Sequence, residues 1–378
     1  MRTEMLSREF ALRPDLVYLN HAAVSPWPAR TRDAVIAFAE QNSLQGSLDY
    51  PAWLETEARL REHLRQLIGA SAVDDIGLLK STSEGLSLVA YGLDWRNGDN
   101  VVISDQEFPS NRIVWESLRE LGVEVRHVDL LSATTPEDAL LAQCDRRTRL
   151  VSVSSVQYAT GLRLDLAALG PYCRRAGVLL CVDAIQSLGA LRMDVETISA
   201  DFVVADGHKW MLGPEGVALF YCRPDLRDQL RLNQYGWHMT EEPTDFDRLD
   251  WKPAQTARRF EAGSPNMLGI HALEASLSLL HEVGMEQVES AVLGKNRRLI
   301  ERLSSLPGIE LITPFAEHRH AGIVTFKPLH GSAEEMHAVL ADNGVFCAVR
   351  GGGLRLSPHF YTPDEQLDRV VELVARNS

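Results

Sequence analysis

The sequence predicts an α/β protein: a mostly parallel, seven-stranded β-sheet between helices, followed by a smaller α+β domain. Two features support this prediction. Between about residues 76 and 222, short continuous apolar runs alternate with stretches of helical period. Strands of a parallel sheet are buried on both faces and lack a polar side, and helices must cover those faces. After residue 265 the order changes to long helical stretches with a few short strands.

The composition is that of a globular protein. The 378 residues suffice for two or three domains, and 45% hydrophobic and 24% charged residues are ordinary values. The net charge of −14 argues against nucleic acid or an anionic membrane as a partner. The five cysteines are scattered and form no CxxC pair, and no stretch resembles a signal peptide or a transmembrane helix. We therefore expect a soluble, cytoplasmic protein without disulfides or a thiolate metal site.

The predicted elements of the large domain follow in order along the chain. A short strand at residues 16–19 precedes two helices, at residues 28–42 and 52–68. The strands of the sheet are then predicted at residues 76–79, 101–104, 123–128, 150–156, 178–182, 202–205 and 216–221. The helices between them are predicted at residues 86–90, 111–121, 136–143 and 164–176.

The C-terminal part is predicted as a separate, smaller domain. Residues 223–265 are irregular, and residues 270–306 have one long helical pattern. Strands at residues 322–326 and 345–349 and helices at residues 333–343 and 363–375 follow. We therefore divide the chain into an N-terminal segment (1–20) that packs with the small domain, a large domain (21–265) and a small domain (266–378).

A lysine and an acid follow two neighbouring strands of the predicted sheet. Lys209 lies in Asp206-Gly-His-Lys-Trp after the strand at 202–205, and Asp183 ends the run before it. A cofactor that binds through an imine and withdraws electrons requires an amine and a carboxylate of this kind. Of the five lysines, only Lys209 has a buried strand and a glycine turn around it. The alternative is a solvated loop lysine and an acid that caps a helix.

A second candidate feature is the segment Lys-Ser-Thr-Ser-Glu-Gly at residues 80–85, between a strand and a helix. Backbone N–H groups, the helix dipole and hydroxyl groups converge at such a helix start and favour an anion such as phosphate. A simple serine or threonine cap is the alternative. Thr82, Phe108, Asp183 and Lys209 all follow strands, so we expect them in one crevice at the carboxyl ends of the strands.

The sequence gives little support for other kinds of functional site. No GxGxxG follows a strand, which argues against a nicotinamide dehydrogenase, and no GxSxG elbow is present. His318 and His320 form an HxH in a polar loop, where solvated histidines are far commoner than zinc ligands. We expect no metal site.

Taken in order, the motifs resemble those of a known family. They are Thr-Ser-Glu-Gly at 82–85, an aromatic residue after Glu107, Asp-x-x-Gln at 183–186, Gly-His-Lys at 207–209 and Arg-x-Glu-Ala-Gly-Ser-Pro-Asn at 259–266. This order resembles the class V aminotransferases, the cysteine desulfurase-like group of fold-type I enzymes that use pyridoxal 5′-phosphate. The resemblance extends from about residue 18 to the last helix.

The resemblance implies a role for each residue around the cofactor ring. Lys209 would bind the cofactor as an imine, and Asp183 would pair with the pyridinium nitrogen so that the ring withdraws electrons. Gln186 would donate to the phenolic oxygen. Phe108 would stack on the ring, and Tyr158 would lie near the ring oxygen.

The resemblance also implies how the phosphate and the substrate are held. Thr82, Ser83 and His208 would lie at the phosphate. Ser264 would reach the phosphate of a partner subunit, which implies a homodimer with shared sites. Arg355 would clamp the α-carboxylate of an amino acid or related amine.

Two loops are expected on the substrate side of the site. One contains Asn20 and His21, and the other contains Trp237 and His238.

Two departures from the family pattern bear on the reaction. Desulfurases have a mobile loop with a catalytic cysteine between the positions of Arg350 and Arg355, where this chain has three glycines and a leucine. Cys347 precedes this gap in an apolar run and is interpreted as a buried structural thiol. Asp206 replaces a hydroxyl residue that often contacts the phosphate, and the sequence offers no account of that acid.

These observations predict a pyridoxal-phosphate enzyme in which Lys209 moves the Cα proton of its substrate. Without the cysteine loop, a persulfide-forming desulfurase is not expected. Transamination is favoured, with β-elimination, including C–S lyase chemistry, close behind, and epimerisation as a third outcome. A catalytically silent protein of the same fold, serving in binding or regulation, is the alternative of another class.

Overall fold

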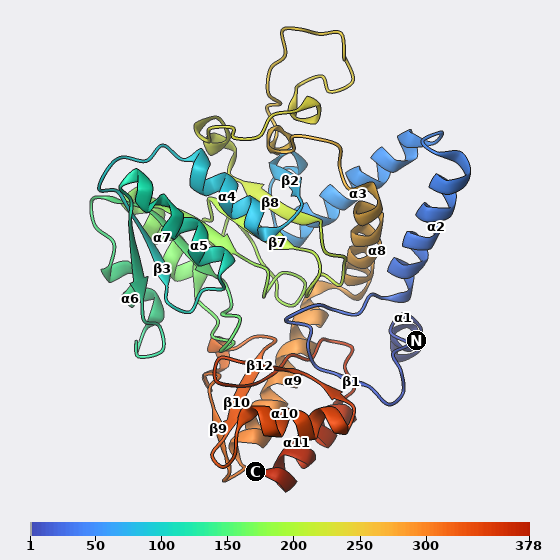
Figure 1. Cartoon of the computed structure of the whole chain (residues 1–378), viewed down its shortest axis with the longest axis vertical. Coiled ribbons are helices and arrows are strands. Elements are labelled where there is room, and N and C mark those ends of the chain that lie inside the picture. Colours follow the sequence, from blue (N-terminus) through green and yellow to red (C-terminus); the bar gives the residue numbers. More distant parts are fainter. Residues whose placement is uncertain (1) are drawn as a thin grey trace.

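The computed structural model describes residues 2–378, and a seven-stranded sheet forms the centre of this part of the chain (Figure 1). Strand β8 is antiparallel to both neighbours, and the other adjacent strands are parallel. The predicted fold class is confirmed. In spatial order the strands are β2 (Ile76–Leu79), β8 (Ala218–Cys222), β7 (Phe202–Asp206), β6 (Leu179–Asp183), β5 (Thr148–Ser154), β3 (Asn100–Ser104) and β4 (Glu124–Val128).

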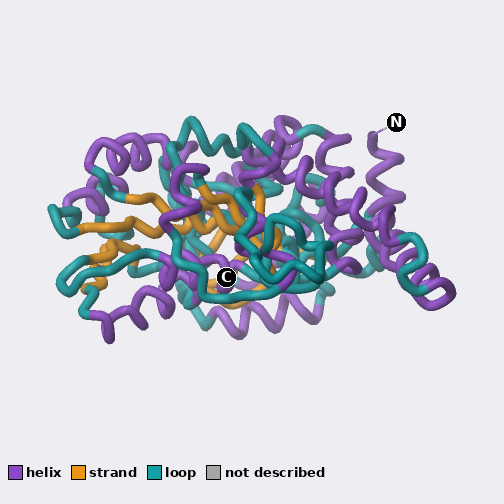
Figure 2. Tube along the Cα trace, turned by 90° about the horizontal axis from the view of Figure 1, so that it is seen from above, coloured by secondary structure: helices purple, strands orange, loops and turns teal. Residues whose placement is uncertain are grey.

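Helices cover both faces of this sheet, and each face has its own apolar core. Successive side chains of a strand point to opposite faces, so Val101 and Ile103 join one core and Val102 the other. The first core includes side chains of α4 (Thr82–Gly92) and α5 (Ser110–Glu116). The second is covered by α3 (Tyr50–Ile68), α6 (Pro136–Ala142), α7 (Leu166–Ala176) and α8 (Met267–Val283). Figure 2 shows the strands enclosed between helices.

The predicted long helix at 270–306 is two helices, α8 and α9 (Met285–Ser304). They meet at Gly284, whose φ of 87° lies in the region that L side chains rarely adopt. Helix α8 packs on α3 and on α2 (Ala29–Gln45), whereas α9 packs on strands of the small domain. The first turns of α9 still belong to the large-domain core, through Val288 and Val292, whereas Leu299, Ile300 and Leu303 belong to the small-domain core. The change of packing partner therefore falls within α9.

The small domain has a four-stranded antiparallel sheet in the order β12-β13-β10-β9. Its strands are β9 (Ile309–Leu311), β10 (Val324–Pro328), β12 (Ala348–Arg350) and β13 (Gly353–Leu356), and its other helices are α10 (Ala333–Asp342) and α11 (Asp364–Asn377). The strand predicted at 345–349 is divided at Cys347, because residues 345–346 form β11 and leave this sheet to pair elsewhere. Strand β9 was not predicted.

The N-terminal segment contacts the small domain through a short pair of strands. It begins with α1 (Arg2–Glu9), which the sequence reading did not predict, and β1 (Val17–Tyr18) pairs in parallel with β11 (Val345–Phe346). Near the top of Figure 1 an irregular loop around residues 240–250 projects from the body. Within residues 2–378, every helix is too short or too polar to span a bilayer.

Candidate active site

Lys209 and Asp183 lie at the carboxyl ends of adjacent strands, as expected. Asp183 is the last residue of β6 and pairs with Val204 of β7, and Lys209 follows β7 by three residues. Both are buried, with 2% of Asp183 and 9% of Lys209 exposed. The turn after the lysine is strained, because Leu212 has a φ of 62° and donates its N–H to the Lys209 carbonyl. Strain of this kind collects at functional sites.

Burial favours the neutral form of both side chains. Desolvation lowers the pKa of Lys209, although the Asp183 carboxylate opposes this, and desolvation raises the pKa of Asp183. Among the described residues, the Asp183 carboxylate accepts a hydrogen bond from the Ile185 N–H at 3.0 Å. A buried carboxylate with so few donors suits a cationic N–H partner such as a pyridinium. The residues present therefore fit a pyridoxal cofactor.

The start of α4, where the sequence predicts an anion cup, lies beside the end of β7. Ser81 caps the helix by accepting the Glu84 N–H, and the Thr82 hydroxyl accepts the Asp206 N–H at 3.0 Å. The Ser83 hydroxyl donates to Ser110 at 2.8 Å. The hydroxyl-rich turn and the strand that leads to Lys209 are thus joined directly.

The structure shows where the Asp206 side chain points. Its Oδ1 lies 3.0 Å from Nδ1 of His208, and both side chains are largely buried. Neither of these two atoms has a hydrogen-bond partner among the described residues, so the two groups face each other without a hydrogen bond. This oxygen of the carboxylate is therefore directed at the histidine ring.

Phe108 lies next to the lysine, with the Lys209 Nζ 5.5 Å from its ring centroid. Tyr158 contacts the Phe108 ring edge to face at 5.2 Å. Behind Phe108 is a buried acid that the sequence reading did not single out. Glu107 accepts hydrogen bonds from the Ser154 N–H at 2.9 Å and from the Gln157 amide at 3.0 Å, and burial raises its pKa. Such a network fixes the backbone on which Phe108 stands.

Arg355 lies in the same group of contacts and is 2% exposed. Its Nη1 donates to the Tyr158 carbonyl at 2.8 Å and its Nη2 to Asn20 Oδ1 at 3.4 Å. Its buried Nε has no hydrogen-bond partner among the described residues. Burial is the main cause that lowers the pKa of Arg355 to about 10. A buried guanidinium with a free donor requires an anion, which suits a carboxylate clamp.

Two predicted residues are engaged within the protein. His21 is fully buried; Nδ1 lies 2.8 Å from the Ser357 carbonyl and Nε2 lies 2.7 Å from the Tyr361 hydroxyl. Neither nitrogen is left for a substrate, so the expected substrate contact of His21 does not fit the structure. Gln186 also bonds on both amide atoms, donating to the Ala22 carbonyl and accepting the Trp210 indole N–H, each at 3.0 Å. One amide hydrogen of Gln186 remains for the ring oxygen.

Ser264 is exposed, and with Lys80 and Glu84 it lines a cavity of about 230 Å³. Its contact with a partner subunit stays a prediction. The His238 ring faces Glu261 at 3.6 Å and is largely buried, and the place of its loop on the substrate side stays a prediction. Trp237 beside it is partly exposed.

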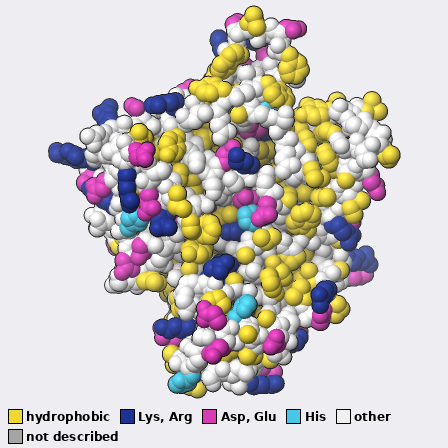
Figure 3. All heavy atoms as spheres, in the orientation of Figure 1, with side chains coloured by type: hydrophobic (Ala, Val, Ile, Leu, Met, Phe, Trp, Pro, Cys, Tyr) yellow, Lys and Arg dark blue, Asp and Glu magenta, His cyan; other side chains and the backbone are white. Residues whose placement is uncertain are grey.

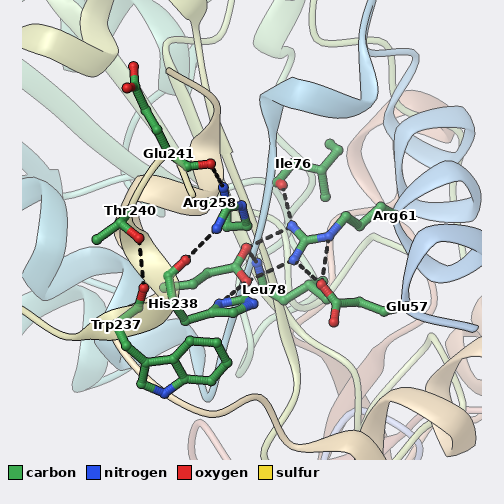
Figure 4. A network of polar contacts seen from close by, with 10 residues as sticks. Glu57, Arg61, Ile76, Leu78, Trp237, His238, Thr240, Glu241 and Arg258 are labelled. Atoms are coloured by element: carbon green, nitrogen blue, oxygen red, sulfur yellow. Dashed lines mark hydrogen bonds and ion pairs between the residues drawn. The ribbon is translucent and has the colours of Figure 1, made fainter. Parts of the chain in front are cut away.

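Near Ser264 lies a buried ion-pair cluster (Figure 4). Arg61 of α3 donates to Glu57, to the Ile76 carbonyl and, through both Nη atoms at 2.7 Å, to the two oxygens of Glu261. Glu261 also accepts the Leu78 N–H at 2.9 Å, so α3, β2 and the segment before Ser264 are held together.

This cluster is better described as an ion-pair network than as a metal centre. Ligand atoms of Glu57, His238 and Glu261 lie within 4.8 Å of one another. However, the Arg61 guanidinium already binds both carboxylates, and a metal cation would have to displace it.

Comparison with known proteins agrees with the geometry. The family model "Aminotransferase class-V" matches residues 17–370. A probable cysteine desulfurase of Methanothermobacter thermautotrophicus is 32% identical, covering 98% of this chain and 97% of its own. The uncharacterized aminotransferase YcbU of Bacillus subtilis is 29% identical, covering 83% of this chain and 82% of its own.

Solved structures share the fold. The cystine C–S lyase C-DES, in complex with its product cysteine persulfide, superimposes with a TM-score of 0.88 at 23% identity, covering 96% of this chain and 98% of its own. A C-DES mutant with glycine covalently linked to the PLP cofactor gives a TM-score of 0.90 at 22% identity, covering 98% of each chain. The chain therefore belongs to the class V aminotransferase family of pyridoxal-phosphate-dependent enzymes.

Proposed function

We propose that this enzyme is a lyase that breaks the Cβ–S bond of a cysteine-type amino acid without a catalytic cysteine of its own. The hairpin β12–β13 carries the proposal, because its two-residue turn at Gly351 and Gly352 has no room for a cysteine loop. Cys347 is 3% exposed and belongs to the small domain's core, and burial raises its pKa to about 12. Such a thiol is a poor nucleophile. Relatives named cysteine desulfurase and cystine C–S lyase support the substrate class.

Each residue has a role in this reaction. The bound cofactor supplies an electron sink for the Cα carbanion. Lys209, whose pKa is lowered by burial, is available as the neutral amine that takes the Cα proton. Arg355 holds the substrate carboxylate, and Asp183 keeps the cofactor's ring nitrogen protonated. When Cβ carries sulfur, the Cβ–S bond breaks and its electron pair leaves with the sulfur.

Transamination, which the sequence favours, is the second candidate. The same lysine supports it, because a proton taken from Cα can be returned to the cofactor side when Cβ has no leaving group. The relative named aminotransferase YcbU is consistent with it. The choice between the two reactions then depends on the substrate more than on Lys209.

The test incubates the holoenzyme with cystine, cysteine and alanine and measures pyruvate, ammonia, reduced sulfur and pyridoxamine phosphate. We expect pyruvate and ammonia from a sulfur substrate, and loss of both in Lys209→Ala. Cys347→Ala should keep wild-type turnover. A Cys347→Ala enzyme that folds normally but is inactive would contradict the proposal. Pyridoxamine phosphate with a keto acid, and no ammonia, would instead indicate transamination.

We further propose a homodimer with shared sites. Figure 3 shows hydrophobic side chains on the surface over α2 and α3 and on the projecting loop. Large exposed apolar groups are typical of surfaces that bind another protein. They include Leu44, Leu48, Tyr235, Phe246, Leu249 and Trp251. Sedimentation of the holoenzyme at micromolar concentration should give the mass of two chains.

A further inference from the structure

A second arginine stands on the same face of the small-domain hairpin as the buried Arg355. In the β12–β13 ladder, Ala348 is opposite Arg355 and Arg350 is opposite Gly353. Residues two apart on a strand share a face, and directly opposed residues also do. Arg350 and Arg355 are therefore diagonal neighbours on one face. Leu354 and Leu356 point the other way, into the small domain's core.

This face is turned toward the large domain beside the active site. Thr325, which pairs with Arg355 on the neighbouring strand, donates its hydroxyl to the Ala159 carbonyl at 2.6 Å. The turn residue Gly351 also lies against Ala159. Tyr158, next along the chain, contacts both Arg355 and Phe108. Arg350 thus stands at the rim of the group of residues that surrounds Lys209.

Neither guanidinium is neutralised within the protein. Among residues 2–378, no carboxylate lies within 4.0 Å of Arg350 or Arg355, although Arg298, Arg302 and Arg319 each pair with an acid. Arg350 is exposed and donates to the carbonyl of its neighbour Val349 at 2.8 Å. Its positive charge disfavours the charged form of Arg355. Although the chain has a net charge of −14, these two adjacent unpaired cations make a locally positive site that favours the binding of an anion.

We propose that Arg350 binds a second anionic group of the substrate, so that the site prefers amino acids with two carboxylates. Arg355 holds the α-carboxylate, and Arg350, nearer the solvent, holds the carboxylate at the far end. The inference rests on the proposed function for the identity of the site. The second carboxylate can belong to an acidic side chain or to the other half of a disulfide-linked diamino acid.

The spacing leaves room for two separate carboxylates. Diagonal neighbours in an antiparallel ladder are about 7–8 Å apart at Cα, and each guanidinium binds a carboxylate as a planar fork. Arg355 is held by Tyr158 and Asn20 from the large domain and the N-terminal segment, whereas the exposed Arg350 bonds to the carbonyl of its own neighbour Val349. Two carboxylates separated by a short chain match this arrangement better than one.

The test measures equilibrium binding of unreactive acids to the holoenzyme by titration calorimetry at low salt. The probes are butyrate, with one carboxylate, and succinate, glutarate, adipate and suberate, with two at increasing separation. After correction for two equivalent ends, we expect the best dicarboxylate to bind about three- to tenfold more tightly than butyrate. If the dicarboxylate that binds most tightly is short, the substrate has an acidic side chain. If it is long, the substrate is a disulfide-linked diamino acid. Binding without turnover keeps this test separate from that of the reaction.

The variants decide whether Arg350 is responsible. Arg350→Ala should remove the preference for dicarboxylates and leave butyrate binding unchanged, and Arg350→Lys should restore part of it. Arg376→Ala, which removes an exposed arginine of α11, is the control for net charge and should behave as wild type. The proposal is overturned if the wild type shows no preference, or if Arg350→Ala weakens butyrate and the dicarboxylates by the same factor.

Discussion

At the scale of single residues, burial sets the charge states on which the chemistry depends. Lys209 and Asp183 are removed from water together, and desolvation pushes the two pKa values toward each other. The lysine becomes available as a neutral base, and the acid becomes costly to ionise until a cation is placed beside it. In the proposed site the cofactor's ring nitrogen would be that cation. The same carboxylate would then be unfavourable in the cofactor-free protein and needed in the holoenzyme.

Asp183→Asn should have opposite effects on stability and on activity. A raised carboxyl pKa gives stability that is full below the unfolded-state pKa and is lost as pH rises through the folded-state value. The cofactor-free wild type should therefore lose stability toward pH 8, and the variant should lose less, as measured by urea unfolding. In the holoenzyme the same change should lower kcat by about a hundredfold or more, because a preorganised charge is removed. A variant with wild-type kcat would show that Asp183 does not act on the ring.

The order of the motifs along the chain predicts that Lys209, Asp183 and Arg355 share one site, and the structure places them close together. The hydrogen-bond partners of the candidate residues could not be predicted from the sequence. His21 and Gln186 are each bonded on both polar atoms to groups far away in the sequence, such as Ser357 and Trp210. Glu107 escaped notice because an isolated acid reads as a surface residue until its hydrogen-bond donors are known. That Asp206 faces the His208 ring also could not be predicted from the sequence.

At the scale of elements, local signals placed the sheet well and the small domain less well. Continuous apolar runs located every strand of the large sheet. The helical pattern at 270–306 concealed a break, because Gly284 is one residue and the apolar period continues across it. The division of residues 345–349 depends on pairing of β11 with the N-terminal strand, which local sequence does not encode. The glycine run in the sequence indicates the hairpin turn. It does not indicate that the turn places Arg350 and Arg355 on the same face of the hairpin.

The two glycines of that turn should respond differently to substitution. Both have positive φ, 60° at Gly351 and 77° at Gly352, as in the tight turns that suit a hairpin's twist. A Cβ on Gly351 would meet Ala159 at 3.0 Å, whereas Gly352 has nothing within 4 Å. Gly351→Val should cost about 2 kcal/mol and weaken butyrate binding, because the strained turn shifts both arginines. Gly352→Asn should stay within about 0.5 kcal/mol of wild type and bind normally. Equal unfolding midpoints and affinities for the two variants would contradict this account.

At the scale of the whole molecule, the two domains and the N-terminal segment meet in a buried group of rings. His21 bonds to Ser357 and Tyr361 of the small domain, and His359 lies 3.0 Å from the carbonyl of Trp210, the residue after Lys209. Burial lowers the pKa of both histidines. The position of the small domain, and with it Arg355, therefore depends on neutral imidazoles at this junction.

This dependence predicts how the protein unfolds in acid. Burial lowers the pKa of His21 to about 4, whereas an unfolded-state histidine has its ordinary value of 6.5. Between these values the unfolded chain binds a proton that the folded protein excludes, so stability is full above pH 6.5 and falls toward pH 4. His21 should contribute a slope of about 1.4 kcal/mol per pH unit.

The variant His21→Gln isolates this contribution, because an amide can donate to the Ser357 carbonyl and accept from the Tyr361 hydroxyl. Urea unfolding from pH 4.5 to 7 should show a slope lower by about one proton than in the wild type. His330→Gln, which removes an exposed histidine from the small domain, should leave the slope unchanged. If His21→Gln keeps the full slope, His21 is already protonated in the folded state. The junction would then hold a buried charge, and the small domain would be fixed by an ion rather than by neutral rings.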